Sequence, residues 1–259
     1  YSNLLSFHII IIRALKEEVI MLNTAKDFKK IYSKNNKLLA SPYDKRDYNF
    51  GDEVPVSAFR IPDNYSTPTA PHIFDQGQSS ECAACSCTGI RYMQEQDQSK
   101  ITTPFSPSFT YANRPEGEDF EGMYIRTVCK QARLGTVPYD VFPGFYSYNE
   151  CKRQFNANKD KWMDMAKPFA ISSFYQCDSR IAMQQAIMMY KGILAGVYVY
   201  RSLYFPDKDG VINYNKNLDT KNYGGHCIIL AGWKTEVSTG KLYWRLINSW
   251  GTDYGKSGI

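Results

Sequence analysis

The type of apolar pattern changes along this chain, and that change limits the folds open to it. Helices are predicted at residues 82–96, 124–134 and within 177–192, from helical spacing, small residues behind a polar loop and glycine stops. Short runs rich in β-branched and aromatic residues follow, in "GILAGVYVY", "GGHCIILAGW" and "KLYWRLINSW". Helices first and strands later predict an α+β fold with two segregated halves.

Charge and hydropathy exclude several classes of protein. The formal net charge is +5, and the first fifty residues carry most of the excess, with 9 Lys or Arg against 5 Asp or Glu. The chain shows no basic stripe with interleaved aromatics, so no nucleic-acid partner is predicted. The longest apolar run, at residues 4–12, is too short to span a bilayer, so no membrane span is predicted. The same run also lacks the basic start and the small-residue cleavage site of a signal peptide.

The stretch "NNKLLASPYDKRDYNFGDEVP" is rich in Asn, Asp, Pro and Gly, which is typical of an extended linker. It follows a segment with helical spacing at residues 15–32. A domain boundary is therefore predicted within residues 40–56.

Three of the seven cysteines, Cys82, Cys85 and Cys87, crowd into "DQGQSSECAACSCTG". A zinc site there needs a second closely spaced Cys or His pair, which the chain lacks. A redox pair needs alternating strands and helices around it, which the pattern does not show. The remaining interpretations are small buried residues, accepted for Cys85 and Cys87, or a nucleophile at Cys82, since a helix N-terminus favours a thiolate.

One histidine follows Cys82 in the chain, which makes His226 the available imidazole partner. Its separation from Cys82 falls in the range of about 130–150 residues found in one cysteine-protease signature. Asn248, in "NSWGTDYGKSG", could fix the tautomer of that ring, and the indole of Trp250 could shield the hydrogen bond. Taken singly, His226 could be a structural core residue and Asn248 a turn residue.

Together, "DQGQSSECAAC", "GGHCIILAGW" and "NSWGTDYGKSGI" resemble the papain-like cysteine peptidases of the cathepsin class, in family order. The resemblance extends from about Pro62 to Ile259, and the "DQGQ" and "GGH" forms are similar to a divergent microbial or large-DNA-virus branch. It implies a papain-like two-lobed α+β fold, with a helical left lobe, an antiparallel β-barrel-like right lobe and an active-site cleft between them.

The resemblance also implies roles for individual residues. Cys82 is the expected nucleophile, His226 the acid and base, Asn248 its orienter, and Gln76 a donor to the oxyanion beside the backbone N–H of Cys82. No cofactor or metal is implied. The expected substrate-binding residues are Gly122, Met123, Gly225, Trp250 and Tyr254.

Four positions depart from the family pattern. Ser79 and Asp119 stand where the family has a pair of disulfide cysteines, which weakens any inference of an oxidising compartment. Glu81 stands where a small residue is usual and Ala83 replaces an expected tryptophan, so altered reactivity is expected. By resemblance alone, the compartment is acidic and lysosome-like, extracellular or virion-associated.

The resemblance divides the chain into a propeptide at residues 1–52 and a catalytic domain at 53–259. Within that domain, the helical lobe is expected at roughly 75–170 and the β lobe at roughly 171–259, with a truncated C-terminus.

The predicted function is a monomeric cysteine endopeptidase that acts on polypeptides through a Cys82 thioester, inhibited by its own N-terminal segment. Endopeptidase action is favoured because the paired histidines of an occluding loop are missing. The alternatives are a non-catalytic binding or structural protein of the same fold, and an acyl transferase that uses the same three residues.

Overall fold

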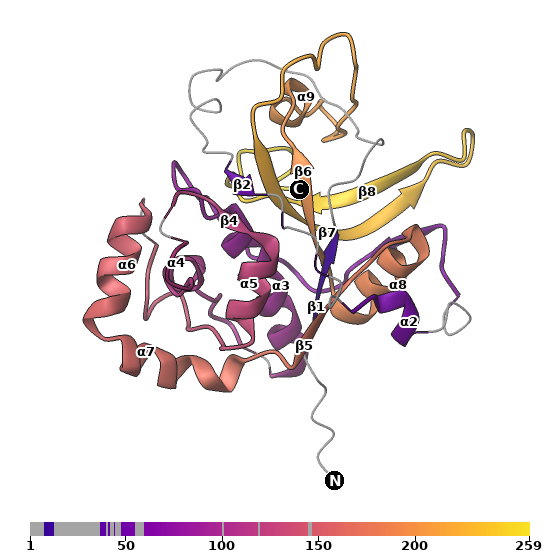
Figure 1. Ribbon diagram of the computed structural model, residues 1–259. Helices are drawn as coiled ribbons and strands as arrows, with labels where there is room; N and C mark the ends of the chain where they lie inside the picture. The colour runs from indigo at the N-terminus through magenta and orange to yellow at the C-terminus, as the bar shows by residue number, and fades with distance from the viewer. Residues whose placement is uncertain are drawn as a thin grey trace.

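The computed structural model describes residues 8–12, 37–39, 41, 44, 48–54, 60–99, 101–118, 120–144 and 147–259, with only the backbone for 8–12. The helical spacing predicted at residues 15–32 and the departure at Asp119 lie outside these residues. Figure 1 shows two parts, with α4, α5, α6 and α7 on one side of α3, and β6, β7, β8 and α8 on the other.

The helical part is built around one buried helix. Its elements are α3 (Cys82–Gln98), α4 (Pro107–Ala112), β4 (Met123–Tyr124), α5 (Ile125–Ala132), α6 (Tyr148–Ala157), α7 (Lys159–Ala166) and η2 (Lys167–Phe169). Every residue of α3 from Cys82 to Glu95 is buried. A Cβ added at Gly89 would lie 2.9 Å from Cδ1 of Ile229, so the small residues of α3 allow it to pack closely against the sheet. The helices predicted at 82–96 and 124–134 are confirmed as α3 and α5.

The β part is a six-stranded sheet in the order β3-β7-β6-β1-β5, with β8 also paired to β7. Its strands are β1 (His8–Ile12), β3 (Asn64–Ser66), β5 (Ser173–Gln176), β6 (Ile193–Tyr198), β7 (Gly225–Thr235) and β8 (Leu242–Ile247). The pairs involving β7 are antiparallel, whereas β1 runs parallel to both β5 and β6. The helices α2 (Phe50–Glu53), α8 (Arg180–Tyr190) and α9 (Arg201–Tyr204) accompany the sheet.

Alternate residues of β7 enter two different hydrophobic cores, as the period of two in a strand requires. Cys227, Ile229 and Ala231 pack in the core that contains α3 and α5. Ile228 and Leu230 pack in the second core, together with residues of α8 and with Phe50 of α2. β7 therefore separates the two cores, and His226 is the second residue of this strand.

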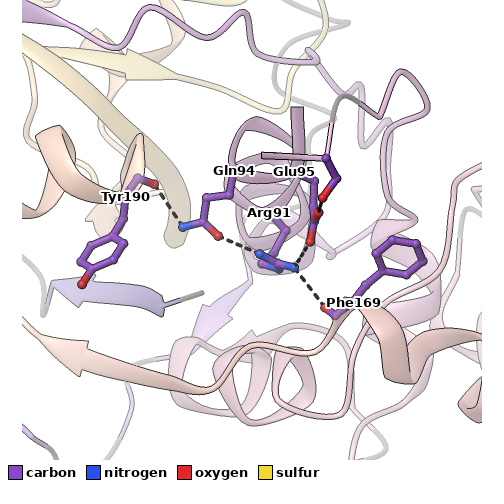
Figure 2. A network of polar contacts seen from close by, with 6 residues as sticks. Arg91, Gln94, Glu95, Phe169 and Tyr190 are labelled. Carbon is purple, nitrogen blue, oxygen red and sulfur yellow. Dashed lines mark hydrogen bonds and ion pairs between the residues drawn. The ribbon is translucent and has the colours of Figure 1, made fainter. Parts of the chain in front are cut away.

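A buried polar network ties α3 to both parts of the molecule (Figure 2). The Arg91 guanidinium donates to Oε1 of Glu95 at 2.7 Å and to the Phe169 carbonyl at 3.2 Å. Arg91 also donates to Oε1 of Gln94, whose amide nitrogen donates to the Tyr190 carbonyl at the end of α8, 3.1 Å away. Each of the three side chains in this network has at least one hydrogen-bond partner, which helps a core to tolerate buried polar groups.

The described parts of the N-terminal region are interwoven with the rest of the chain. β1 lies inside the sheet, and the short strand β2 (Leu38–Leu39) pairs with β4 in parallel. Phe50 is 1% exposed and belongs to the core beside α8. The predicted boundary between residues 52 and 53 falls inside α2, and the division into propeptide and catalytic domain stays a prediction.

Candidate active site

Cys82 is the first residue of α3 and is 1% exposed. Its thiol makes a hydrogen bond with the backbone of Cys227, the neighbour of His226, so the start of α3 meets the start of β7. Burial is the main cause that raises the pKa of Cys82 to about 11, and the nearby Glu81 raises it further. Backbone hydrogen bonds, including those at the start of α3, act in the opposite direction.

His226, Asn248 and Trp250 form one compact group at the ends of β7 and β8. Nε2 of His226 lies 2.7 Å from Oδ1 of Asn248, which also accepts from the backbone N–H of Ser249. The Trp250 ring stacks on the imidazole, with centroids 4.7 Å apart and 29° between the planes. Tyr254 packs edge-on against the far side of this aromatic stack, at 5.2 Å from the Trp250 ring. The imidazole is thus oriented by an amide oxygen and shielded from water by an indole.

Gln76 is buried in the loop before α3 and is held at both ends of its amide. Its Nε2 donates to the Ser79 carbonyl at 2.9 Å, and its Oε1 accepts from Oγ of Ser249 at 2.6 Å. These two contacts fix which end of the amide carries the N–H groups. The loop is joined to the "NSW" segment by backbone as well, since Gln76 N–H donates to the Ser249 carbonyl.

Comparison with protein families decides what this arrangement is. The family described as "Papain family cysteine protease" matches residues 68–259, which is most of the chain. The chain belongs to the papain family of cysteine proteases.

Relatives and solved structures agree with that assignment. A cathepsin B-like cysteine proteinase 6 of Caenorhabditis elegans is 28% identical over 130 residues, which are 50% of this chain and 32% of the relative. Xylellain, a cysteine protease from Xylella fastidiosa, superposes with a TM-score of 0.68 at 19% identity over 91% of both chains. A procathepsin B of Trypanosoma congolense gives 0.65 at 14% identity, covering 89% of this chain and 80% of that one. The predicted papain-like α+β fold is confirmed.

In this papain-family site, a segment of the chain itself runs along the expected substrate-binding residues. Leu38 and Leu39 pair with Met123 and Tyr124 of β4, and Lys37 forms a bridge with Gly225 on the opposite wall. A Cβ at Gly225 would overlap the Leu38 carbonyl, which shows how closely the segment lies. Residues 37–39 thus touch expected substrate-binding residues of both parts, Met123 of β4 and Gly225 of β7.

Gly122, one of the expected substrate-binding residues, has both of its backbone polar groups bound within the protein. Its N–H donates to the Tyr111 hydroxyl at 3.0 Å, and its carbonyl accepts from Nη1 of Arg114. The extended segment pairs with the next two residues instead. The pairing of a substrate with Gly122 stays a prediction.

Glu81 is the N-cap residue of α3 and is 5% exposed. Its Oε2 accepts from Oγ of Ser108 at 2.9 Å. Burial raises the pKa of Glu81 to about 7, although hydrogen bonds from Ser108 and Ser79 lower it and the charge of Glu121 raises it. This carboxyl therefore changes its charge near neutral pH, one residue before the cysteine.

The sequence reasoning missed three residues of this site: Ser249, Tyr111 and Arg114. Ser249 lies inside the recognised "NSW" motif, so its place beside Gln76 had a local signal. Tyr111 and Arg114 had no local sequence signal, because their contacts with Gly122 depend on the folding of the loop between α4 and β4.

All seven cysteines are free and buried thiols. Among the residues that the structure describes, no group of three or more His, Cys, Asp or Glu side chains could hold a metal ion. No helix in the described ranges is both long and apolar enough to cross a membrane.

Proposed function

We propose that this chain is a cysteine endopeptidase, in which Cys82 attacks the carbonyl carbon of a peptide bond. The observation that carries the proposal is the oriented imidazole of His226, with Nε2 bound to Asn248 at 2.7 Å under the Trp250 ring. With Nε2 engaged, Nδ1 is the ring nitrogen that takes the thiol proton and later gives it to the leaving amine.

Two N–H donors are proposed for the oxyanion that forms in this attack. One is the backbone N–H of Cys82, and the other is the side-chain amide of Gln76, which is oriented by the Ser79 carbonyl and by Oγ of Ser249. Donors of this kind are held before the reaction begins and contribute a large share of the rate in acyl transfer. The resulting Cys82 thioester is hydrolysed by water, with His226 as the base.

The test combines labelling and hydrolysis. Iodoacetamide and an epoxysuccinyl inhibitor are applied from pH 4 to 8, and the modified peptide is mapped; we expect modification at Cys82 alone, although six other thiols are present. Cys82→Ala is expected to abolish hydrolysis of a quenched peptide while Cys177→Ala does not. A folded chain that neither reacts at Cys82 nor cleaves peptides, both in the parent sequence and in the Leu38→Asp, Leu39→Asp variant described below, would favour a non-catalytic protein with this fold, an alternative motivated by Glu81 beside the cysteine.

We propose further that residues 37–39 inhibit the enzyme by occupying its cleft. They contact Met123 on one wall and Gly225 on the other, and Cys82 is almost completely buried while they do so. Burial is the largest cause of the high pKa of Cys82, so removal of the segment is expected to lower that pKa as well as to open the cleft.

Replacement of two side chains tests this inhibition better than truncation at Glu53, which would also delete β1 and Phe50 from the β part. Leu38→Asp with Leu39→Asp is expected to speed alkylation of Cys82 at least tenfold, because two half-buried leucines become charged. Leu218→Asp, at a side chain that is 59% exposed, is the control. Equal alkylation rates in all three chains would refute the inhibitory role.

Endopeptidase action is proposed because the sequence lacks the paired histidines of an occluding loop. The chain has three histidines, and His72 packs against Phe74 and Tyr92 instead of lining the cleft. Mass analysis of products from a long peptide tests this, since release of terminal dipeptides alone would contradict it. The same assay with an added amine detects acyl transfer in place of hydrolysis.

A further inference from the structure

We propose that Tyr111 and Arg114 are positioning residues that set the helical wall of the substrate cleft by holding the peptide groups of Gly122. The inference rests on the proposed function and deepens it, because it names residues that govern peptide affinity without touching the reacting atoms. Both residues are buried, Tyr111 at the end of α4 and Arg114 just after it.

The two side chains bind both polar groups of the Gly122 backbone. The Tyr111 hydroxyl accepts the Gly122 N–H at 3.0 Å and donates to Oε2 of Glu121 at 3.1 Å. The Arg114 guanidinium donates through Nη1 to the Gly122 carbonyl and through Nε to the Tyr111 carbonyl, at 3.0 Å for the latter. Tyr111 and Arg114 therefore orient the two peptide groups on either side of Gly122.

Aromatic rings hold the guanidinium in place. Its central carbon lies 3.8 Å from the centroid of the Tyr148 ring and 4.3 Å from that of Tyr111. The two rings meet edge to face, with centroids 5.4 Å apart. A planar cation that stacks and donates in two directions has no equivalent in lysine, whose ammonium is a point charge.

The position of Gly122 determines where β4 begins. Its φ is 98°, in the left-handed region that favours glycine, so the turn has few ways to relax if its contacts are lost. Met123 and Tyr124, the residues that pair with the extended segment, follow directly. The contacts of Tyr111 and Arg114 with the Gly122 backbone thus lie directly before the two residues that pair with the extended segment.

The consequence is a separation between peptide binding and thiol chemistry. Tyr111 and Arg114 contact the turn before β4, whereas Cys82 is positioned by α3 and the backbone of Cys227. Loosening of the turn is expected to weaken the binding of extended peptides and to leave the reactivity of Cys82 with small reagents unchanged.

The experiment measures kcat, KM and iodoacetamide labelling in the Leu38→Asp, Leu39→Asp chain. Tyr111→Phe is expected to raise KM for a long peptide about tenfold, since it removes the acceptor of a buried N–H. The values of kcat and of the labelling rate are expected to stay within about twofold. Tyr92→Phe is the matched control, because its hydroxyl donates to the Thr102 carbonyl, away from β4.

A second variant and a second measurement distinguish a loss of positioning from a general loss of folding. Arg114→Lys is expected to raise KM by at least as much as Tyr111→Phe, with unfolding midpoints measured alongside. Hydrogen–deuterium exchange of the peptide that contains residues 121–124 is expected to speed up in Tyr111→Phe and not in Tyr92→Phe, in the full chain and without any need for activity.

The outcomes separate this inference from the proposed function. Equal KM values in Tyr111→Phe and Tyr92→Phe, or a parallel fall in kcat and labelling, would overturn the positioning role. Unchanged exchange at residues 121–124 would overturn it in an inactive chain too. A parent chain without hydrolysis or labelling at Cys82 would instead overturn the peptidase proposal, and with it the role in peptide affinity.

Discussion

The two ends of α3 bury charge in different ways. At the C-terminal end, Arg91 and Glu95 form an ion pair at 2.7 Å, with side chains 1% and 4% exposed (Figure 2). At the N-terminal end, Glu81 accepts from the hydroxyl of Ser108, and burial raises its pKa to about 7. Glu95 thus has a cation as its partner, whereas Glu81 is buried beside a neutral hydroxyl and can lose its charge by taking up a proton.

The difference matches the surroundings of each end. The paired end supports the contact between the two parts of the molecule, through the carbonyls of Phe169 and Tyr190. The titrating end lies directly before Cys82, where a change of charge alters the pKa of the thiol. One helix thus combines a permanent structural link with a site whose electrostatics depend on pH.

The largest expected effect comes from breaking the ion pair. Arg91→Met leaves Glu95 buried without its partner and is expected to lower the free energy of unfolding by about 3–5 kcal/mol. Urea denaturation measures the loss. The control is Arg153→Met, which breaks an exposed pair with Glu150 and is expected to have a much smaller effect. Similar losses in the two variants would contradict the structural role of the Arg91 pair.

The next effect concerns Glu81 and stability. Its pKa is raised from 4.5 to about 7 on folding, so the folded state holds the proton more tightly than the unfolded state. The stabilisation from this group is complete below pH 4.5 and is lost as the pH rises through about 7, a change of about 3 kcal/mol. Glu81→Gln is expected to remove this part of the pH dependence. Parallel stability curves for the parent and the variant, measured from pH 4 to 8, would contradict it.

The smallest effect concerns the thiol. Because the charge of Glu81 raises the pKa of Cys82, Glu81→Ser and Glu81→Gln are expected to lower the pH at which Cys82 is alkylated, by less than about one unit. The variant Glu118→Gln, which removes a carboxylate that accepts from Thr127, controls for the loss of one negative charge that is not among the causes of the Cys82 pKa shift. An alkylation profile that does not move in the Glu81 variants would refute the coupling.

Much of the fold was predictable because its signals are local. The small residues after Cys82 predicted the buried helix α3, and the β-branched runs predicted β6, β7 and β8. The motifs around Cys82, His226 and Asn248 are local too, and the structure brings their elements together. Their catalytic roles stay predictions.

Other features depend on contacts that no local pattern encodes. The parallel insertion of β1 between β5 and β6 joins segments that are far apart in the sequence. Phe50 lies in a stretch with the composition of a linker, yet it packs in the core beside α8. The hold of Arg114 on Gly122 likewise arises from the tertiary path of the loop before β4.

The network of Figure 2 also bears on how a peptide enters the cleft. The helix that carries Cys82 at one end is fastened at the other to the Phe169 carbonyl, on the helical side, and to the Tyr190 carbonyl, beside the sheet. The same helix is therefore joined to both parts of the molecule. If the proposed peptidase function holds, we expect these contacts to fix the spacing of the two parts, and discrimination among peptides to depend on side chains and not on domain closure.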